Sequence, residues 1–115
     1  MSKARAKGTA AETLVVKFLR ENGFPDADRS PLRGKLDTGD VTGVRNVVIE
    51  IKNQKSYSIP GWLRELEVEI HNAKVDHGFV VAKPNGVGST RVGEWWAILP
   101  LWRMVELLKK SCNES

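Results

Sequence analysis

The sequence predicts a small α/β domain whose sheet packs against helices. Three observations carry this prediction: helical periodicity near both ends of the chain, short apolar segments of strand character between them, and turn residues that separate the segments. The 115 residues are 41% hydrophobic and 28% charged. This is enough for one domain with a buried core and too little for a second domain.

The first half of the chain reads as one helix followed by three strands. Apolar residues three and four positions apart predict a helix with Thr9 as its N-cap, which ends at Gly23 and Pro25. We expect strands at residues 27–30, 40–42 and 46–53, with a turn at 43–45. In the third strand, Val47, Ile49 and Ile51 would face one side of the sheet, and Val48, Glu50 and Lys52 the other.

The second half begins with an ambiguous segment, residues 60–74. Alternation from 64 to 71 fits a strand, whereas a stripe of apolar residues fits a helix: Leu63, Leu66, Ile70 and Ala73. Pro60 suits a first helical turn, so we predict a helix here. Strands at residues 77–83 and 95–99 and a last helix from Pro100 complete the order α-β-β-β-α-β-β-α.

The composition excludes several classes of protein. No apolar run approaches the roughly 20 residues of a membrane span, and the polar N-terminus does not fit a secretory signal. The single cysteine, Cys112, excludes an internal disulfide framework. We therefore expect a cytoplasmic protein with no membrane partner, forming a single domain over residues 1–115 with flexible tails at 1–7 and 110–115.

Positive charge is concentrated at the N-terminal end. The net charge is +4, and residues 1–35 alone hold eight basic residues against four acidic ones. The basic residues are Lys3, Arg5, Lys7, Lys17, Arg20, Arg29, Arg33 and Lys35. A basic end on a neutral body indicates either a polyanionic partner such as DNA or RNA, or an ordinary solvated surface.

The candidate for chemistry is an acid-acid-lysine set. Glu50 and Lys52 share a strand face, and Asp40 would lie near Glu50 if residues 40–42 and 46–53 pair as a hairpin. Two adjacent carboxylates repel unless a cation lies between them. Mg²⁺ prefers such oxygen ligands, and the backbone carbonyl of Ile51 could complete the set. The alternative is a same-face ion pair between Glu50 and Lys52 with no catalytic role.

Lys52 fits a role beside such a metal. An ammonium group can position or help deprotonate an attacking water, and it can offset negative charge that develops on a phosphate. The sequence therefore predicts a phosphodiester hydrolase. The glycine-rich loop at residues 86–90 lacks the lysine of a nucleotide-binding phosphate loop, so we expect no nucleotide cofactor.

Several segments of the chain together form a recognisable pattern. They are Lys7-Gly8-Thr9-Ala10-Ala11-Glu12, Glu21-Asn22-Gly23-Phe24, Arg29-Ser30, Asp37-Thr38-Gly39-Asp40-Val41 and Val48-Ile49-Glu50-Ile51-Lys52-Asn53. This arrangement resembles the PD-(D/E)xK nuclease superfamily, and within it the archaeal Hjc-type Holliday junction resolvases and small phage-encoded relatives. The resemblance covers residues 7–53 by motif and the remainder only by element order.

The resemblance implies a restriction-endonuclease-like αβββαβ core with a mixed sheet flanked by helices. It implies that Asp40 and Glu50 bind Mg²⁺, for which Mn²⁺ can substitute, and that Lys52 is the catalytic lysine. Glu12 would approach the metal directly or through water, and Ser30 would lie by the scissile phosphate. Relatives act as homodimers on branched DNA, so we expect a homodimer here.

Three positions leave alternatives open. Gly39 stands where the family pattern has a proline, and Asp37 competes with Asp40 as the first metal ligand. Asp37 could instead assist a second metal or shape the turn. Thr9 and Glu12 also fit a capping box, in which Glu12 bonds back to the start of the helix.

Further residues near the acids are candidates for DNA contacts: Lys7, Arg29, Arg33, Lys35, Asn53, Gln54 and Lys55. The resulting prediction is a Mg²⁺-dependent, structure-selective endodeoxyribonuclease, of the Holliday junction resolvase type, that acts on branched or duplex DNA. The alternatives are a flap, fork or other DNA nuclease with the same site, a nuclease directed at RNA, and a non-catalytic nucleic-acid-binding module.

Overall fold

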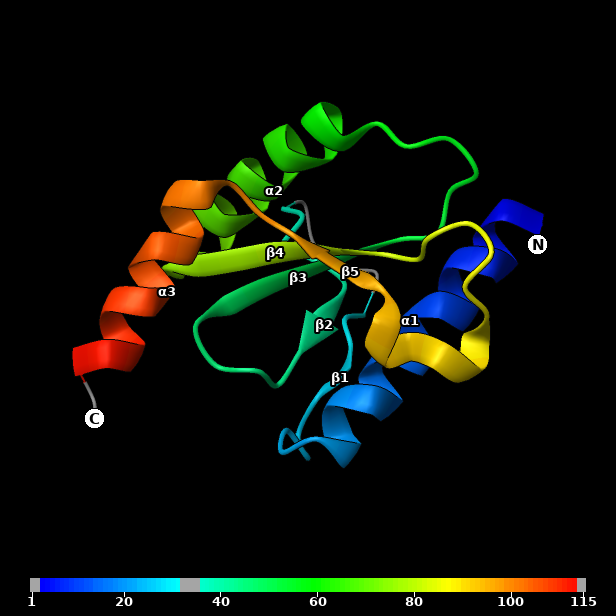
Figure 1. Ribbon diagram of the computed structural model, residues 1–115, viewed down its shortest axis with the longest axis horizontal. Helices are drawn as coiled ribbons and strands as arrows, with labels where there is room; N and C mark the ends of the chain where they lie inside the picture. The colour runs from blue at the N-terminus through cyan, green and yellow to red at the C-terminus, as the bar shows by residue number, and fades with distance from the viewer. Residues whose placement is uncertain (1–2, 32–35, 114–115) are drawn as a thin grey trace.

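The fold is a mixed three-stranded sheet between helices, with a two-stranded ribbon beside it (Figure 1). The computed structural model describes residues 3–31 and 36–113. The elements are α1 (Lys3–Glu21), β1 (Asp28–Arg29), β2 (Val41–Thr42), β3 (Val47–Lys52), α2 (Ile59–Ala73), β4 (His77–Ala82), the 3₁₀-helix η1 (Ser89–Glu94), β5 (Trp96–Ile98) and α3 (Leu101–Asn113). The predicted α/β class and element order are confirmed, including the helix at residues 60–74.

The central sheet has the order β3-β4-β5. β3 and β4 are parallel, in a register that pairs Glu50 with Val80, and α2 connects them. β5 pairs antiparallel with the other edge of β4, so the sheet is mixed as predicted. The finer expectation of a restriction-endonuclease-like core stays a prediction.

The predicted hairpin between the second and third strands is wrong, because β2 pairs with β1 instead. Gly43 follows β2 at φ +81, and a Cβ at this position would lie 1.9 Å from the carbonyl oxygen of Asp26. Only a residue without a side chain permits this approach of the two backbones. Asp40 nevertheless reaches β3, where its N–H donates a hydrogen bond of 2.9 Å to the carbonyl of Ile49.

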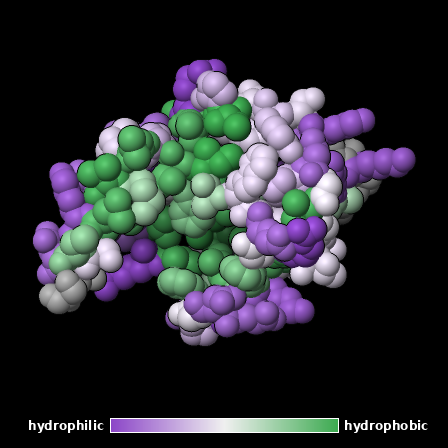
Figure 2. All heavy atoms as spheres, viewed as in Figure 1, coloured by the Kyte–Doolittle hydropathy of each residue, from purple (hydrophilic) through white to green (hydrophobic). Residues whose placement is uncertain are grey.

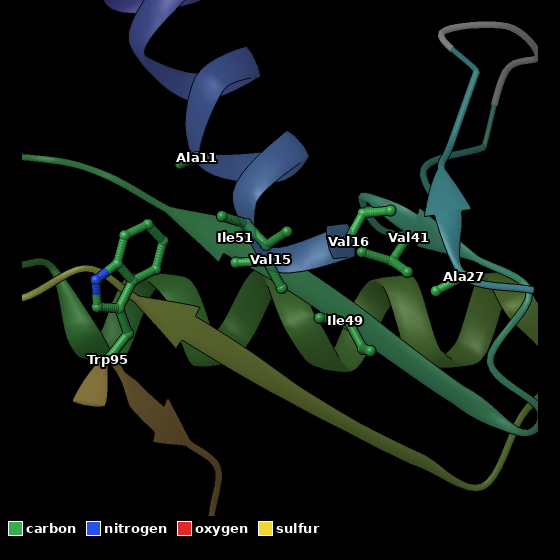
Figure 3. Packing of buried hydrophobic residues seen from close by; sticks show 8 residues of the cluster. All are labelled: Ala11, Val15, Val16, Ala27, Val41, Ile49, Ile51 and Trp95. Atoms are coloured by element: carbon green, nitrogen blue, oxygen red, sulfur yellow. The ribbon is translucent and has the colours of Figure 1, made fainter. Parts of the chain in front are cut away.

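The two faces of β3 enter different cores, as the alternation predicts. Ile49 and Ile51 belong to a cluster with Val15 and Val16 of α1, which lies across this face of the sheet (Figure 3). On the opposite face, the second cluster consists of Val48, Trp62, Leu66, Ile70, Val80 and Ala82. Glu50 and Lys52 share the second face and therefore point toward α2.

The first helix begins at Lys3, six residues before the predicted start. Lysine, alanine and arginine are good helix formers, and they extend the helix through this segment. Thr9 is thus a mid-helix residue, and its carbonyl accepts a hydrogen bond from the hydroxyl of Thr13. The capping-box interpretation of Glu12 is wrong. Residues 3–7 and 110–113, expected in the tails, belong to α1 and α3.

The last helix is fixed to the body by one buried arginine. The Arg103 guanidinium donates two hydrogen bonds, of 2.7 and 2.6 Å, to the Glu67 carboxylate and one to the Asp76 carbonyl. The rest of α3 exposes large apolar side chains: Leu101, Trp102, Met104, Val105 and Leu108. Figure 2 shows hydrophobic side chains gathered over this end of the molecule. Within the described ranges, no helix has the length and apolar character that crossing a membrane requires.

Candidate functional site

The candidate site is a pocket of about 460 Å³ at the carboxyl end of β3. Residues of α1, of the segment before β2, of β3 and of the loop after it line the pocket. They are Lys7, Gly8, Glu12, Asp40, Glu50, Ile51, Lys52, Asn53, Gln54 and Lys55. The structure thus brings the acid-acid-lysine set and Glu12 to one place.

Asp40 is held against β3 by its backbone and by its side chain. Its N–H donates to the Ile49 carbonyl, and its Oδ2 accepts a hydrogen bond of 2.8 Å from the Ile51 N–H. The Asp40 carbonyl also accepts a bond of 2.9 Å from the Ser30 N–H. These bonds replace the predicted hairpin ladder and still place the carboxylate beside Glu50.

The backbone at Gly39 excludes a proline at this position. Its φ is +98, whereas the proline ring fixes φ near −65°. A Cβ at this position would also lie 2.8 Å from Cγ1 of Val48. The path that delivers Asp40 to β3 in this chain therefore requires a glycine.

Asp40 and Glu50 are desolvated carboxyl groups close to one another. Burial, together with the nearby Glu50 carboxyl, raises the pKa of Asp40 to about 8. Burial also raises the pKa of Glu50 to about 8, and the neighbouring Glu69 carboxyl adds to this shift. Two carboxyl groups this close resist being ionised at the same time, because their negative charges repel. A divalent cation bound between them offsets that repulsion.

Glu12 joins the same electrostatic group from α1. Burial and the negative charge of Asp40 raise the pKa of Glu12, against the opposing effect of Arg29. The Arg29 Nε donates a hydrogen bond of 3.4 Å to Oε1 of Glu12. Arg29 therefore contacts the acidic group directly.

Lys52 has its carbon chain buried and its ammonium bonded to α2. Its side chain is 15% exposed, and Nζ donates a hydrogen bond of 3.1 Å to Oε2 of Glu65. Burial opposes the charge, but the bond to Glu65 and the charges of Glu50, Glu65 and Asp40 outweigh it and raise the pKa of Lys52. Lys52 is therefore a permanent cation in this pocket.

Two acidic residues of α2, Glu65 and Glu69, were missed by the sequence interpretation. Glu69 is 2% exposed, and its carboxyl oxygen lies within 4.8 Å of carboxyl oxygens of Asp37 and Glu50. Burial first, and then the negative charges of Asp37 and Asp40, raise the pKa of Glu69. The available signal was its position, since Glu69 lies one turn from Leu66 on the buried stripe of α2.

The remaining predicted residues fall into three groups. Lys7, Asn53, Gln54 and Lys55 line the pocket, and Arg29 reaches it through Glu12. Ser30 adjoins it through its backbone bond to Asp40, while Asp37 joins Glu50 and Glu69. Arg33 and Lys35 lie outside the described residues.

Lys7, Asn53, Gln54 and Lys55 form the polar rim of the pocket. The loop after β3, which carries the last three of them, is held by hydrogen bonds at its far end. The Asn85 amide donates to the Lys55 carbonyl, and the Asn85 N–H donates to the Tyr57 hydroxyl oxygen. Tyr57 packs edge-on against Trp62 and Trp96. These contacts fix where Lys55 leaves the sheet.

The chain was compared with family models, with curated proteins and with solved structures, and none of them matched it.

Proposed function

We propose that this protein is a divalent-cation-dependent endodeoxyribonuclease, selective for branched DNA in the manner of a Holliday junction resolvase. The observation that supports this most is the shared pocket of Asp40, Glu50, Lys52 and Glu12. Phosphodiester hydrolysis needs carboxylates that bind a metal ion, a cation such as lysine near the phosphate, and polar residues around an open site that hold the substrate. The resemblance in residues 7–53 supplies the preference for branched DNA.

The donor set fits Mg²⁺ or Mn²⁺. Asp40 and Glu50 present hard oxygen ligands, and burial, followed by the neighbouring carboxyl groups, raises their pKa values. The Ile51 carbonyl is the third proposed ligand. When bound, such an ion polarises a phosphoryl oxygen and acidifies its water.

The other side chains have separate roles in this proposal. Lys52, held protonated by its acidic neighbours, acts as a fixed positive charge that stabilises negative charge developing on the phosphate. Glu12 would approach the ion directly or through water, and Ser30 would lie by the scissile phosphate. Lys7, Arg29, Asn53, Gln54 and Lys55 contact neighbouring phosphates and sugars. Arg33 and Lys35 are proposed to extend this contact.

The test is cleavage by the purified chain with Mg²⁺ or Mn²⁺ on four-way, flap, fork and linear DNA side by side. The four-way junction should be cut fastest. Glu50→Gln should lower the rate about 100-fold or more, because it removes a ligand charge while preserving shape. Matched RNA junctions test whether the sugar matters.

The control is Glu106→Gln on α3, an exposed glutamate paired with Lys109. It removes the same charge away from the pocket and should cut like the unchanged protein. Equal cutting of all four DNAs would overturn junction selectivity and leave the nuclease. Metal-independent binding without any cleavage would instead identify a binding module.

The proposed homodimer places two sites on opposite strands of one junction. The exposed apolar side chains of α3 support self-association, because contiguous apolar surface of this kind marks interaction sites. Light scattering should give twice the chain mass of 12.8 kDa. A monomer at micromolar concentration would overturn this part of the proposal.

A further inference from the structure

Glu69 is a buried acid without a hydrogen-bond donor. It is 2% exposed, and within the described part of the chain neither of its carboxyl oxygens has a hydrogen-bond partner. A buried carboxylate in this condition costs several kcal/mol relative to one that is paired. An apolar residue would fit the stripe of α2 without that cost. The position therefore calls for a ligand that glutamate can bind.

The carboxylate of Glu69 is aimed at two others. Asp37, Glu50 and Glu69 each offer an oxygen, and the three oxygens lie within 4.8 Å of one another. Oxygens on opposite sides of a bound Mg²⁺ are about 4.2 Å apart, and around Ca²⁺ about 4.8 Å apart. The three oxygens therefore need only small side-chain movements to surround a divalent cation.

Asp37 is held in position by two hydrogen bonds. The Gly39 N–H donates to its Oδ1 at 3.0 Å, and the Asn72 amide donates to its carbonyl at 3.0 Å. Asn72 lies on α2, like Glu69. The same helix therefore supplies one ligand and orients the backbone of another.

The side chains around Glu50 carry enough negative charge to balance a second divalent ion. Six carboxyl groups belong to one network of electrostatic interactions that also includes Lys52: Glu12, Asp37, Asp40, Glu50, Glu65 and Glu69. Two cationic side chains, Lys52 and Arg29, are hydrogen-bonded to them. Four negative charges remain when all six are ionised. One divalent ion at Asp40 and Glu50 removes half of this excess.

We propose that Asp37, Glu50 and Glu69 bind a second divalent cation, which fastens α2 to the segment before β2. Its role is structural: it supplies the missing partner of Glu69 and joins both segments to β3 through Glu50. It rests on the proposed function in one respect, since Glu50 is shared with the proposed catalytic ion.

The test counts ions by titrating Mn²⁺ into the full chain in a calorimeter, without DNA. The unchanged protein and Glu106→Gln should each bind two ions. Glu69→Gln should bind one and retain the ion at Asp40, and Asp40→Asn should bind one and retain the ion at Glu69. Binding of Mn²⁺ should also raise the melting temperature, and by less in Glu69→Gln.

The outcomes separate this inference from the proposed function. Two ions in Glu69→Gln, or one ion in the unchanged protein that only Asp40→Asn removes, overturns the second site and leaves the nuclease proposal. One ion that only Glu69→Gln removes supports the structural site and overturns the catalytic one. If Mn²⁺ leaves the melting temperature of the unchanged protein unaltered, no ion binds the folded chain, and both the second site and the catalytic site are overturned. Asp37→Asn, at an exposed position, repeats the test if Glu69→Gln fails to fold.

Discussion

Asp40 and Glu50 make the stability of the metal-free protein depend on pH. Each has a pKa of about 8 in the fold, against 3.8 and 4.5 as ordinary values. Between those limits the folded chain holds protons that the unfolded chain has released, so stability falls as pH rises. In EDTA, we expect the free energy of unfolding from urea titrations to decrease from about pH 4 to pH 8 and to level off above.

The control for this prediction is the double variant Asp40→Asn with Glu50→Gln, which should give a flatter profile. Saturating Mg²⁺ should also flatten it, because the ion competes with the protons for the same oxygens. A metal-free profile that rises across this range would contradict the burial of the two carboxyls.

At this scale, the local pattern was sufficient to find Asp40, Glu50 and Lys52 but insufficient to find their partners on α2. Strand alternation places Glu50 and Lys52 on one face, whatever lies opposite. Glu69 contacts them only because the connection through α2 returns it over that face. The sequence alone does not show that contact, because the contact depends on how the elements are connected in space. Its only trace is an acid where the helical stripe calls for an apolar residue.

At the scale of elements, the pattern predicted which segments are strands better than it predicted their pairing. The apolar run before Glu50 and the periodicity of residues 60–74 identify β3 and α2. The partner of β2 depends instead on Gly43, whose backbone meets that of Asp26. A glycine is compatible with many turns, so its presence does not identify the partner of β2. The contact that determines this partner joins Gly43 to Asp26, which is distant in the sequence. The predicted hairpin failed for that reason.

The stability of the β1–β2 ribbon should therefore depend on Gly43 for two reasons: its positive φ and its close contact with the backbone of Asp26. Gly43→Ala should lower the free energy of unfolding by about 3 kcal/mol, since it adds a clash to the cost of a positive φ. Gly86→Ala is the matched control, at φ +83 with open space around the added methyl, and should cost about 1 kcal/mol. Urea unfolding of both variants measures the difference. Equal losses would mean that the contact with Asp26 is unimportant.

Over the whole molecule, charge is divided between the acidic pocket and its basic surroundings. The net charge is +4, and the pocket at β3 is lined by three carboxyl groups and three lysines. Once these carboxyl groups are ionised they repel a polyanion, so the lysines of the rim must supply the attraction that holds it there. Lys7 and Lys55 line the same pocket as the acids, so they are placed to provide that attraction.

DNA binding should weaken with salt in proportion to the phosphate contacts that the rim makes. Each phosphate neutralised adds about 0.9 to the slope of log affinity against log salt. In a Glu50→Gln background, which leaves the DNA uncut, Lys55→Gln should lower that slope by about 1 per binding site. Lys109→Gln on α3 removes the same charge from an exposed position paired with Glu106 and should leave the slope unchanged. Fluorescence anisotropy with a labelled four-way junction at several salt concentrations measures both slopes, and equal slopes would remove Lys55 from the proposed DNA interface.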